Sequence, residues 1–305
     1  MNTESNAIPE FPIEARVAAP TVISEAQRMY WSVRRELWEN RSIYIAPLAV
    51  ATLALVSFTL SIIAGIWERP LRLDPAHPQA PFDMVAGLLM VTGIIVSVFY
   101  CLDALYGERR DRSILFWKSL PVSDLTTVLS KASIPLVVLP LLTFAITVAT
   151  QWTMLLVSSA VLLASGQSVA MLWTNLSFLQ MSLLLLYHLL TAHALWPAPV
   201  YCWLLLVSGW ARRAPFVWAV LPLVAIAGVE RLAFHTWHFA VLVGGRFIGD
   251  APTVVSMGPD KFPTDPMTHI TPGHFLASPG LWVGLLFSAA CLAAAVRLRR
   301  DRGPI

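Results

Sequence analysis

Charged side chains are scarce in this sequence of 305 residues. Asp, Glu, Lys and Arg make up 13% of it, about half of their usual share in a soluble domain, while apolar residues make up 57%. A water-soluble globule of this composition would be hard to keep in solution, which excludes that class. The net charge of +3 comes from short basic clusters between apolar runs, so we expect no nucleic-acid partner and a lipid bilayer as the surroundings.

Signals of a self-powered or secreted protein are missing too. No glycine is followed by lysine, so the chain lacks the phosphate-binding loop Gly-x-x-x-x-Gly-Lys-[Ser/Thr] of ATPases. Residues 1–22 have no basic region ahead of an apolar core, which predicts a cytoplasmic tail and not a cleavable signal peptide. Cys101, Cys202 and Cys291 lie singly in apolar stretches, without disulfide or metal-site spacing, so we expect them to pack in the interior. We expect no metal, cofactor or catalytic residue on this chain.

Long uncharged runs predict an all-α fold with six transmembrane helices in one domain, residues 43–305. The run from Ala132 to Ala211 is 80 residues long and exceeds one helix, so we place an external turn at residues 165–168 and a proline kink at residues 196–199. The expected spans are residues 43–67, 83–105, 133–163, 174–210, 214–240 and 277–297.

The distribution of basic residues predicts the orientation of these spans. This layout assigns 16 Lys and Arg residues to one side and four to the other, with Arg231 left within or near the membrane. By the positive-inside rule the first side is cytoplasmic, so both termini face the cytoplasm of a bacterial inner (plasma) membrane. Residues 244–279 then form an outer segment, rich in Gly and Pro.

Residues 23–42 are expected to form an amphipathic helix on the cytoplasmic membrane surface. Apolar residues recur at steps of three or four, and charged residues fall on the other side. Tryptophans near the boundary suit the interface between headgroups and water. The residues expected to make this contact are Met29, Trp31, Val33, Leu37 and Trp38. A solvated helix packed on a partner is the alternative.

The segment from Tyr106 to Lys131, YGERRDRSILFWKSLPVSDLTTVLSK, contains eight charged residues between two apolar runs. Pro121 interrupts it, and Ser123 with Asp124 gives a capping signal for a new helix, which predicts a helix, a break and a second helix at the cytoplasmic surface. The pattern Glu108-Arg109, then Ser113-Ile114-Leu115, then Leu-Pro-Val-Ser and Lys131 resembles the signature of ATP-binding-cassette (ABC) exporter permeases of the second type. Arg112 stands where that family often has Gly.

The resemblance implies a permease that pairs as a homodimer and binds cytosolic ATPase chains, which hold ATP and Mg²⁺. A coupling helix between spans two and three would dock on the ATPase, and the amphipathic helix would help to carry the motion into span one. The residues expected to couple to the ATPase are Glu108, Arg109, Arg110, Asp111, Arg112, Leu115, Trp117, Lys118 and Pro121. The chain would then export an unidentified substrate and would itself not be an enzyme. A loop whose charges only fix orientation is the alternative.

Ionisable residues within the predicted membrane region are further candidates. Glu230 and Arg231 are adjacent on span five, about 100° apart around a helix, so we expect each to find its own partner, and a transport path is one hypothesis for them. Histidines near spans four and five support a rival, a membrane-embedded metal-dependent enzyme with Glu230 as acid or base. These are His188, His193, His235, His238, His269 and His274. Their spacing matches no recognised metal pattern. A non-catalytic anchoring subunit is a third possibility.

Overall fold

The computed structural model describes residues 24–68, 80–119, 122–166, 168–170, 173, 178–248 and 272–301. Within these residues every regular element is helical, and six helical segments are long and apolar enough to cross a membrane. The predicted all-α fold with six such segments is therefore confirmed, and it is consistent with a multi-pass membrane protein. Residues 1–22, Pro121 and most of the expected outer segment 244–279 lie outside the described residues.

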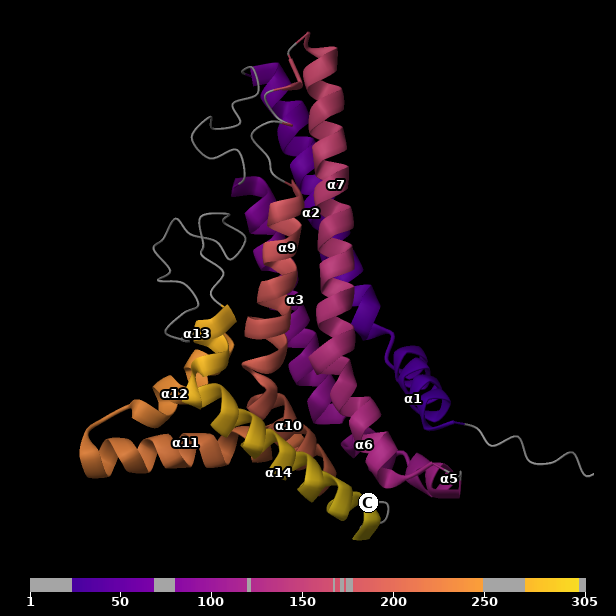
Figure 1. The fold of residues 1–305 in the computed structure, drawn as a ribbon, viewed down its shortest axis with the longest axis vertical. Coiled ribbons are helices and arrows are strands. Elements are labelled where there is room, and N and C mark those ends of the chain that lie inside the picture. Colours follow the sequence, from indigo (N-terminus) through magenta and orange to yellow (C-terminus); the bar gives the residue numbers. More distant parts are fainter. Residues whose placement is uncertain are drawn as a thin grey trace, which may run out of the picture.

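Four helices form the main bundle, in which they lie side by side (Figure 1). Their bounds are α2 (Ser42–Glu68), α3 (Ala80–Asp103), α7 (Leu139–Ala164) and α9 (Phe178–His188). Leu89, Met154 and Leu185 are fully buried between them, whereas Leu60 and Phe99 are more than 60% exposed. Helices that are apolar on every side bury one face in a core and leave the rest for lipid, which suits this arrangement.

The third candidate span is one continuous helical segment, Asp124–Ala164. It consists of α6 (Asp124–Ser133), a π-helical segment η1 (Ile134–Val138) and α7. The helix begins earlier than the expected span 133–163 because Ser123 caps it, its hydroxyl accepting a hydrogen bond from the Thr126 amide. Pro135 has no amide hydrogen to donate, and the π-helical hydrogen bonding begins beside it.

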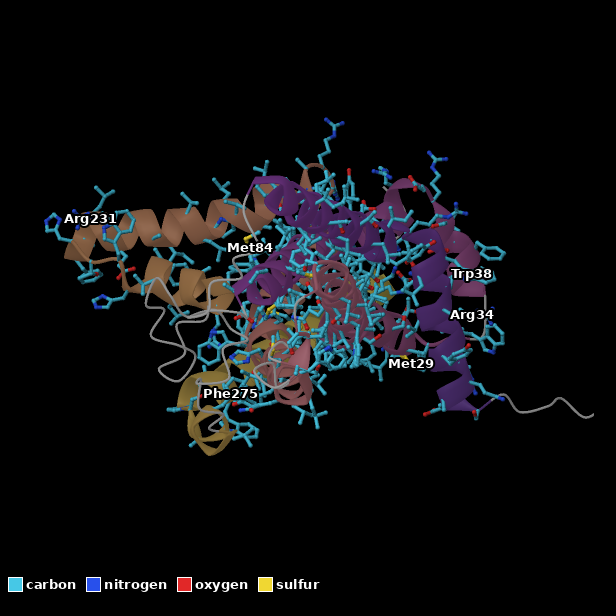
Figure 2. The ribbon with its side chains drawn as sticks, turned by 90° about the horizontal axis from the view of Figure 1, so that it is seen from above. Met29, Arg34, Trp38, Met84, Arg231 and Phe275 are labelled. Carbon is cyan, nitrogen blue, oxygen red and sulfur yellow. The ribbon has the colours of Figure 1, made fainter. Side chains whose placement is uncertain are left out.

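The expected kink in span four is present. A second π-helical segment, η2 (Leu189–Leu195), continues α9, and α10 (Ala198–Trp210) begins after Pro197. Beyond α10 the chain forms α11 (Pro215–Phe234) and α12 (His238–Ile248), a helical hairpin that projects sideways from the bundle (Figures 1 and 2). His235 is in the left-handed region, at φ 56°, so the expected span 214–240 divides into two helices.

The last helices return to the bundle. A short helix, α13 (Pro272–Ala277), precedes α14 (Pro279–Asp301), which packs along α10. The two helices approach closely at Gly284, where an added β-carbon would lie 2.9 Å from the Pro199 side chain, so only glycine fits. This packing carries the C-terminal end of α14 to the end of the bundle where α5 and α6 lie (Figure 1).

Three short helices complete that end of the molecule. They are α1 (Glu25–Glu39), which precedes α2, and α4 (Tyr106–Arg110) and α5 (Ser113–Ser119), which lie between α3 and α6. A capping box starts α1, in which the Ser24 hydroxyl and the Gln27 side chain each accept the other residue's amide hydrogen. Helix α1 packs against α6, so the N-terminal helix and the segment between spans two and three meet.

Candidate functional site

Six charged side chains from four helices gather at this end of the bundle, and we call them the ionic cluster. Three are acidic and three are basic, so their formal charges balance. The members are Arg35 and Glu36 of α1, Glu108 of α4, Asp124 and Lys131 of α6, and Arg299 of α14. Glu36 and Lys131 are almost fully buried, at 0% and 2% exposed. Ions removed from water need close partners, and the cluster supplies them.

Lys131 lies at the centre of the cluster. Its Nζ is 2.8 Å from Glu36 Oε1 and 3.2 Å from Glu108 Oε1, so it joins α1 to α4 through α6. Arg35 makes the same two contacts from the other side, with Nη2 at 2.7 Å from Glu36 and 3.1 Å from Glu108. Two carboxylates that would repel one another are thereby held together by two cations.

Arg299 connects the C-terminal helix to the same carboxylates. Its Nη1 pairs with Glu108 Oε2, and its Nε lies 3.1 Å from Asp124 Oδ1. The guanidinium side chain is 4% exposed. One arginine therefore links α14 both to α4 and to the start of α6. A guanidinium suits this role, because its planar group has several N–H donors and can bind two carboxylates at once.

The second oxygen of Glu36 accepts a hydrogen bond of 2.8 Å from the Tyr100 hydroxyl, which brings the end of α3 into the cluster. Burial by itself raises the pKa of Glu36, but the charges of Lys131 and Arg35 outweigh it and hold that pKa below its ordinary value. The Glu36 carboxylate is thus ionised at neutral pH.

Hydrogen bonds to groups outside the ionic cluster fix α4 against the end of α10. The Ser208 hydroxyl accepts hydrogen bonds from the amides of Leu105 and Tyr106, at 3.0 and 2.8 Å. Arg109 is 5% exposed, and its Nη1 donates to the carbonyls of Gly209 and Ala211 at the end of α10. Arg109 therefore satisfies carbonyls that a helix end leaves without partners.

The remaining predicted coupling residues lie mainly on the outside. Arg110, Asp111, Arg112 and Lys118 are exposed, and Leu115 is 59% exposed. Phe116, which sequence reasoning did not select, is 60% exposed beside Leu115 on α5. The segment 106–119 thus has a buried side, which includes Glu108, Arg109 and Ile114, and an outer side that is basic and apolar. Helix α5 contains Trp117; its side chain and Pro121 are outside the described parts.

The departure at Arg112 from the permease pattern has a structural counterpart. Arg112 adopts φ 58°, between α4 and α5, in the left-handed region that glycine occupies without strain. The backbone therefore has, at the position where that family often has Gly, the conformation that Gly favours. A residue in this region interrupts the helix, so α4 and α5 are separate helices.

No family model, curated protein or solved structure matches the chain.

The residues expected to lie at the membrane surface divide between two sides of α1. Met29, Val33 and Leu37 are partly buried, and the last two pack against the core that includes Ile43 and Tyr100. Trp31 and Trp38 are 57% and 69% exposed. The apolar face predicted for the helix faces the protein, and the two tryptophans point elsewhere.

Glu230 and Arg231 lie at the distal turn between α11 and α12, away from the bundle; Figure 2 labels Arg231 at that tip. The Glu230 carboxylate accepts hydrogen bonds from the Thr236 hydroxyl and from the amides of His238 and Phe239, at 2.7 to 2.8 Å, and so caps α12. Arg231 donates to the His235 carbonyl. Each residue has its own partner, as expected, but the partners belong to the turn.

The histidines of the rival metal-site interpretation lie apart. His188 and His193 belong to the α9–η2 segment, whereas His235 and His238 are at the tip of the α11–α12 hairpin. No group of three or more His, Cys, Asp and Glu side chains within the described ranges could hold a metal ion. His269 and the side chain of His274 fall outside those ranges.

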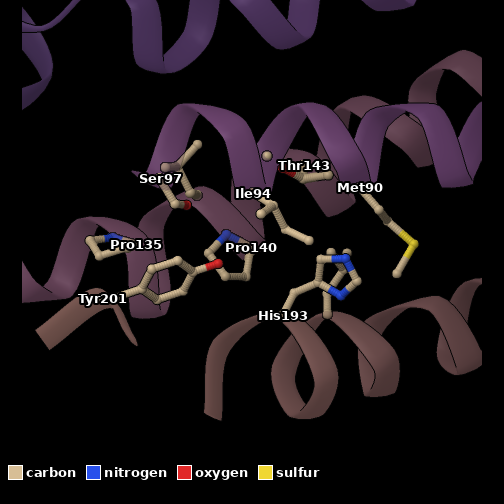
Figure 3. A pocket seen from close by; sticks show the side chains of 11 residues that line it. Met90, Ile94, Ser97, Pro135, Pro140, Thr143, His193 and Tyr201 are labelled. Atoms are coloured by element: carbon tan, nitrogen blue, oxygen red, sulfur yellow. The ribbon is translucent and has the colours of Figure 1, made fainter. Parts of the chain in front are cut away.

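One small cavity lies between α3, η1, α7, η2 and α10 (Figure 3). Its polar lining consists of Ser97, Thr143, His193 and Tyr201, and the ring of His193 points into it. The volume is ≈ 10 Å³, about the room that one water molecule needs. The cavity is too small to hold a molecule larger than water.

Sequence reasoning missed Glu36, Tyr100 and Arg299 as site residues. Glu36 had a detectable signal, since it lies seven residues after Met29 and three after Val33, on the stripe of α1 that faces the protein. A carboxylate in such a stripe needs a buried cation. Its partner Lys131 lies 95 residues later in the sequence, and no local pattern indicates that the two residues pair.

Proposed function

We propose that this chain is the transmembrane permease subunit of an ATP-driven ABC exporter in a bacterial inner membrane, with both termini in the cytoplasm. Two copies form the pathway for a substrate, and a separate ATPase chain binds ATP and Mg²⁺. The observation that carries the proposal is the ionic cluster, which connects α4, the helix that precedes and contacts the outward helix α5, to four of the six candidate spans.

The connections are specific. Glu108 of α4 is held by Lys131 at the start of span three and by Arg299 at the end of span six. Arg35 and Glu36 bring in α1, which continues into span one, and Tyr100 belongs to span two. A push on α5 would pass to α4, which it contacts, and from Glu108 of α4 to all of these spans through packed ion pairs. A rigid junction of this kind can transmit a force between helices. Charges that served only to fix the orientation of the chain in the membrane would not need to be buried and paired.

The outer side of α5 suits a protein partner. Leu115 and Phe116 are two large apolar side chains in a surface that also has Arg110, Arg112 and Lys118. Interfaces use buried apolar anchors within a polar rim, and basic residues favour an acidic counterpart. Ile114, at 1% exposed, anchors the helix from below. We therefore assign docking to the exposed residues, and positioning to Glu108 and Arg109.

The pairing of two copies is part of the proposal. Only 6% of the apolar window of α11 is buried, and Leu221, Val224 and Leu232 are each more than 50% exposed. Either lipid or the α11–α12 hairpin of a second copy of the chain can cover such a surface. The second arrangement would enclose a pathway between two bundles, which the small cavity within one bundle does not provide.

A labelling experiment tests the orientation on which the proposal depends. The three native cysteines are all buried, so the wild-type chain gives a low background. Lys118→Cys should react with a membrane-impermeant thiol reagent only after the cells are permeabilised. Labelling in intact cells would place α5 on the outer side and exclude an ATPase partner.

A purification experiment tests the partner itself. The tagged chain, expressed from its own chromosomal neighbourhood, should co-purify with a nucleotide-binding ATPase. Leu115→Asp together with Phe116→Asp should abolish that association, whereas the conservative pair Leu115→Met and Phe116→Leu, which keeps both side chains apolar, should retain it. Purification of a folded chain with no ATPase would contradict the proposal.

A further inference from the structure

The outward side of α1 has a stripe of three side chains that the ionic cluster does not use. Trp31, Arg34 and Trp38 are three and four residues apart, so they lie on one side of the helix. The Arg34 guanidinium carbon is 5.1 Å from the centroid of the Trp31 ring and 5.0 Å from that of Trp38. Arg34 and Trp38 project away from the bundle (Figure 2).

Arg34 differs from its neighbour Arg35 in its partners. Arg35 points toward the protein and pairs with Glu36 and Glu108, whereas within the described ranges Arg34 has no hydrogen bond or ion pair to a carboxylate. A guanidinium has five donor hydrogens. The two tryptophan rings attract its charge, but they do not accept conventional hydrogen bonds from these donors, as a carboxylate or phosphate oxygen would. The stripe is therefore a cationic site with open donor capacity.

The position of the stripe indicates which acceptor meets it. Helix α1 ends at Glu39, and α2, the first candidate span, begins at Ser42, so α1 lies within a few residues of the membrane boundary. Tryptophan and tyrosine prefer that boundary, and Tyr30, 58% exposed, stands edge-on to Trp31. The anions at this level are phospholipid phosphates, which arginine binds through two parallel hydrogen bonds.

We propose that Trp31, Arg34 and Trp38 form a binding site for the phosphate of an anionic phospholipid headgroup. The two rings hold the guanidinium in a fixed orientation, and the headgroup accepts its hydrogen bonds. The site lies on the same helix as Arg35 and Glu36, so a bound headgroup also fixes the position of the ionic cluster. The inference requires only that the chain sits in a membrane and is independent of the transport function.

The test measures lipid binding by the intact chain in detergent. Native mass spectrometry gives the affinity of the first phosphatidylglycerol and of the first phosphatidylcholine that bind. The decisive variant is Arg34→Lys, which keeps the charge but loses the planar fork, and the matched control is Arg41→Lys, at an exposed arginine without ring contacts. Thermal unfolding checks that every variant is folded.

We expect Arg34→Lys to weaken phosphatidylglycerol binding by about fivefold, because it removes the guanidinium. We expect the double variant Trp31→Leu and Trp38→Leu to weaken it to the same extent, because it removes the two rings that orient the guanidinium. Arg41→Lys should leave the affinity unchanged, and phosphatidylcholine should bind more weakly than phosphatidylglycerol to the wild-type chain. Equal affinities for the two lipids, equal effects of the two lysine variants, or displacement of the lipid by millimolar inorganic phosphate would each overturn the proposal.

Discussion

Replacement of Lys131 by methionine removes the central cation of the ionic cluster while retaining an unbranched apolar side chain of nearly the same length. The lysine lies 2.8 Å from Glu36 and 3.2 Å from Glu108. With an effective dielectric constant of about 20, the two attractions amount to roughly 6 and 5 kcal/mol before the cost of burying the ions is subtracted. Loss of one partner of a buried pair typically costs about 3–5 kcal/mol net, because the remaining charge stays buried.

We therefore expect Lys131→Met to lower the free energy of unfolding by about 3–5 kcal/mol. The assay is thermal unfolding of the purified chain in one fixed detergent. Lys118→Met is the matched control, because Lys118 is exposed and donates a hydrogen bond of 3.3 Å to the carbonyl of Arg300; its cost should stay within about 0.5 kcal/mol. A Lys131→Met variant as stable as this control would refute the interpretation of the cluster as a junction.

A double-mutant cycle separates this pairing from simple loss of packing. Glu36→Gln in the Lys131→Met background removes the carboxylate that has lost Lys131 and retains Arg35 as its cation, while Glu108 keeps Arg35 and Arg299. The double variant should then be more stable than the sum of the single effects by about 1–3 kcal/mol. Strict additivity would mean that the two side chains do not interact.

Substitutions at Arg112, Glu36 and Glu230 give three further predictions. Arg112→Gly should raise thermal stability by about 1 kcal/mol, because glycine adopts a φ of 58° without strain, whereas Arg112→Ala should bring no gain. The folded-state pKa of Glu36 is lowered, so its stabilisation is complete above about pH 4.5 and is lost as the pH falls through the folded value; Glu36→Gln should flatten the decline of the unfolding temperature in acid. Glu230→Gln should accelerate amide hydrogen exchange at the start of α12 without changing exchange near the ionic cluster, and acceleration in both places would contradict a local capping role.

The sequence predicts those features of the fold that depend on local patterns. Uncharged runs identify the six candidate spans, and the break after Trp196 follows from Pro197, which lacks an amide hydrogen. Ser123 signals the restart of the helix through its hydroxyl. The end of α11 at His235 has no such signal, because a left-handed residue there is neither Gly nor Asn.

The site could be predicted only in part, because its contacts join distant segments. The stretch that contains Glu108 is recognisable from its charges, but which of these charges are buried depends on Arg299, 191 residues away. Arg109 appears in the sequence as one more surface arginine, and only the packing of α4 on α10 shows that it caps a helix end. Only the packing of the helices shows that Arg109 is buried and holds α4 in place, whereas its neighbour Arg110 is exposed and available for docking.

The most direct test of the account is photo-crosslinking in living cells from a reactive amino acid placed at Phe116. The account predicts a crosslink from this position to an ATP-binding-cassette ATPase, and none from Leu232, which is also exposed and apolar but lies on the distal part of α11. Absence of any ATPase crosslink at Phe116, in cells where the chain is folded in the membrane, would contradict it.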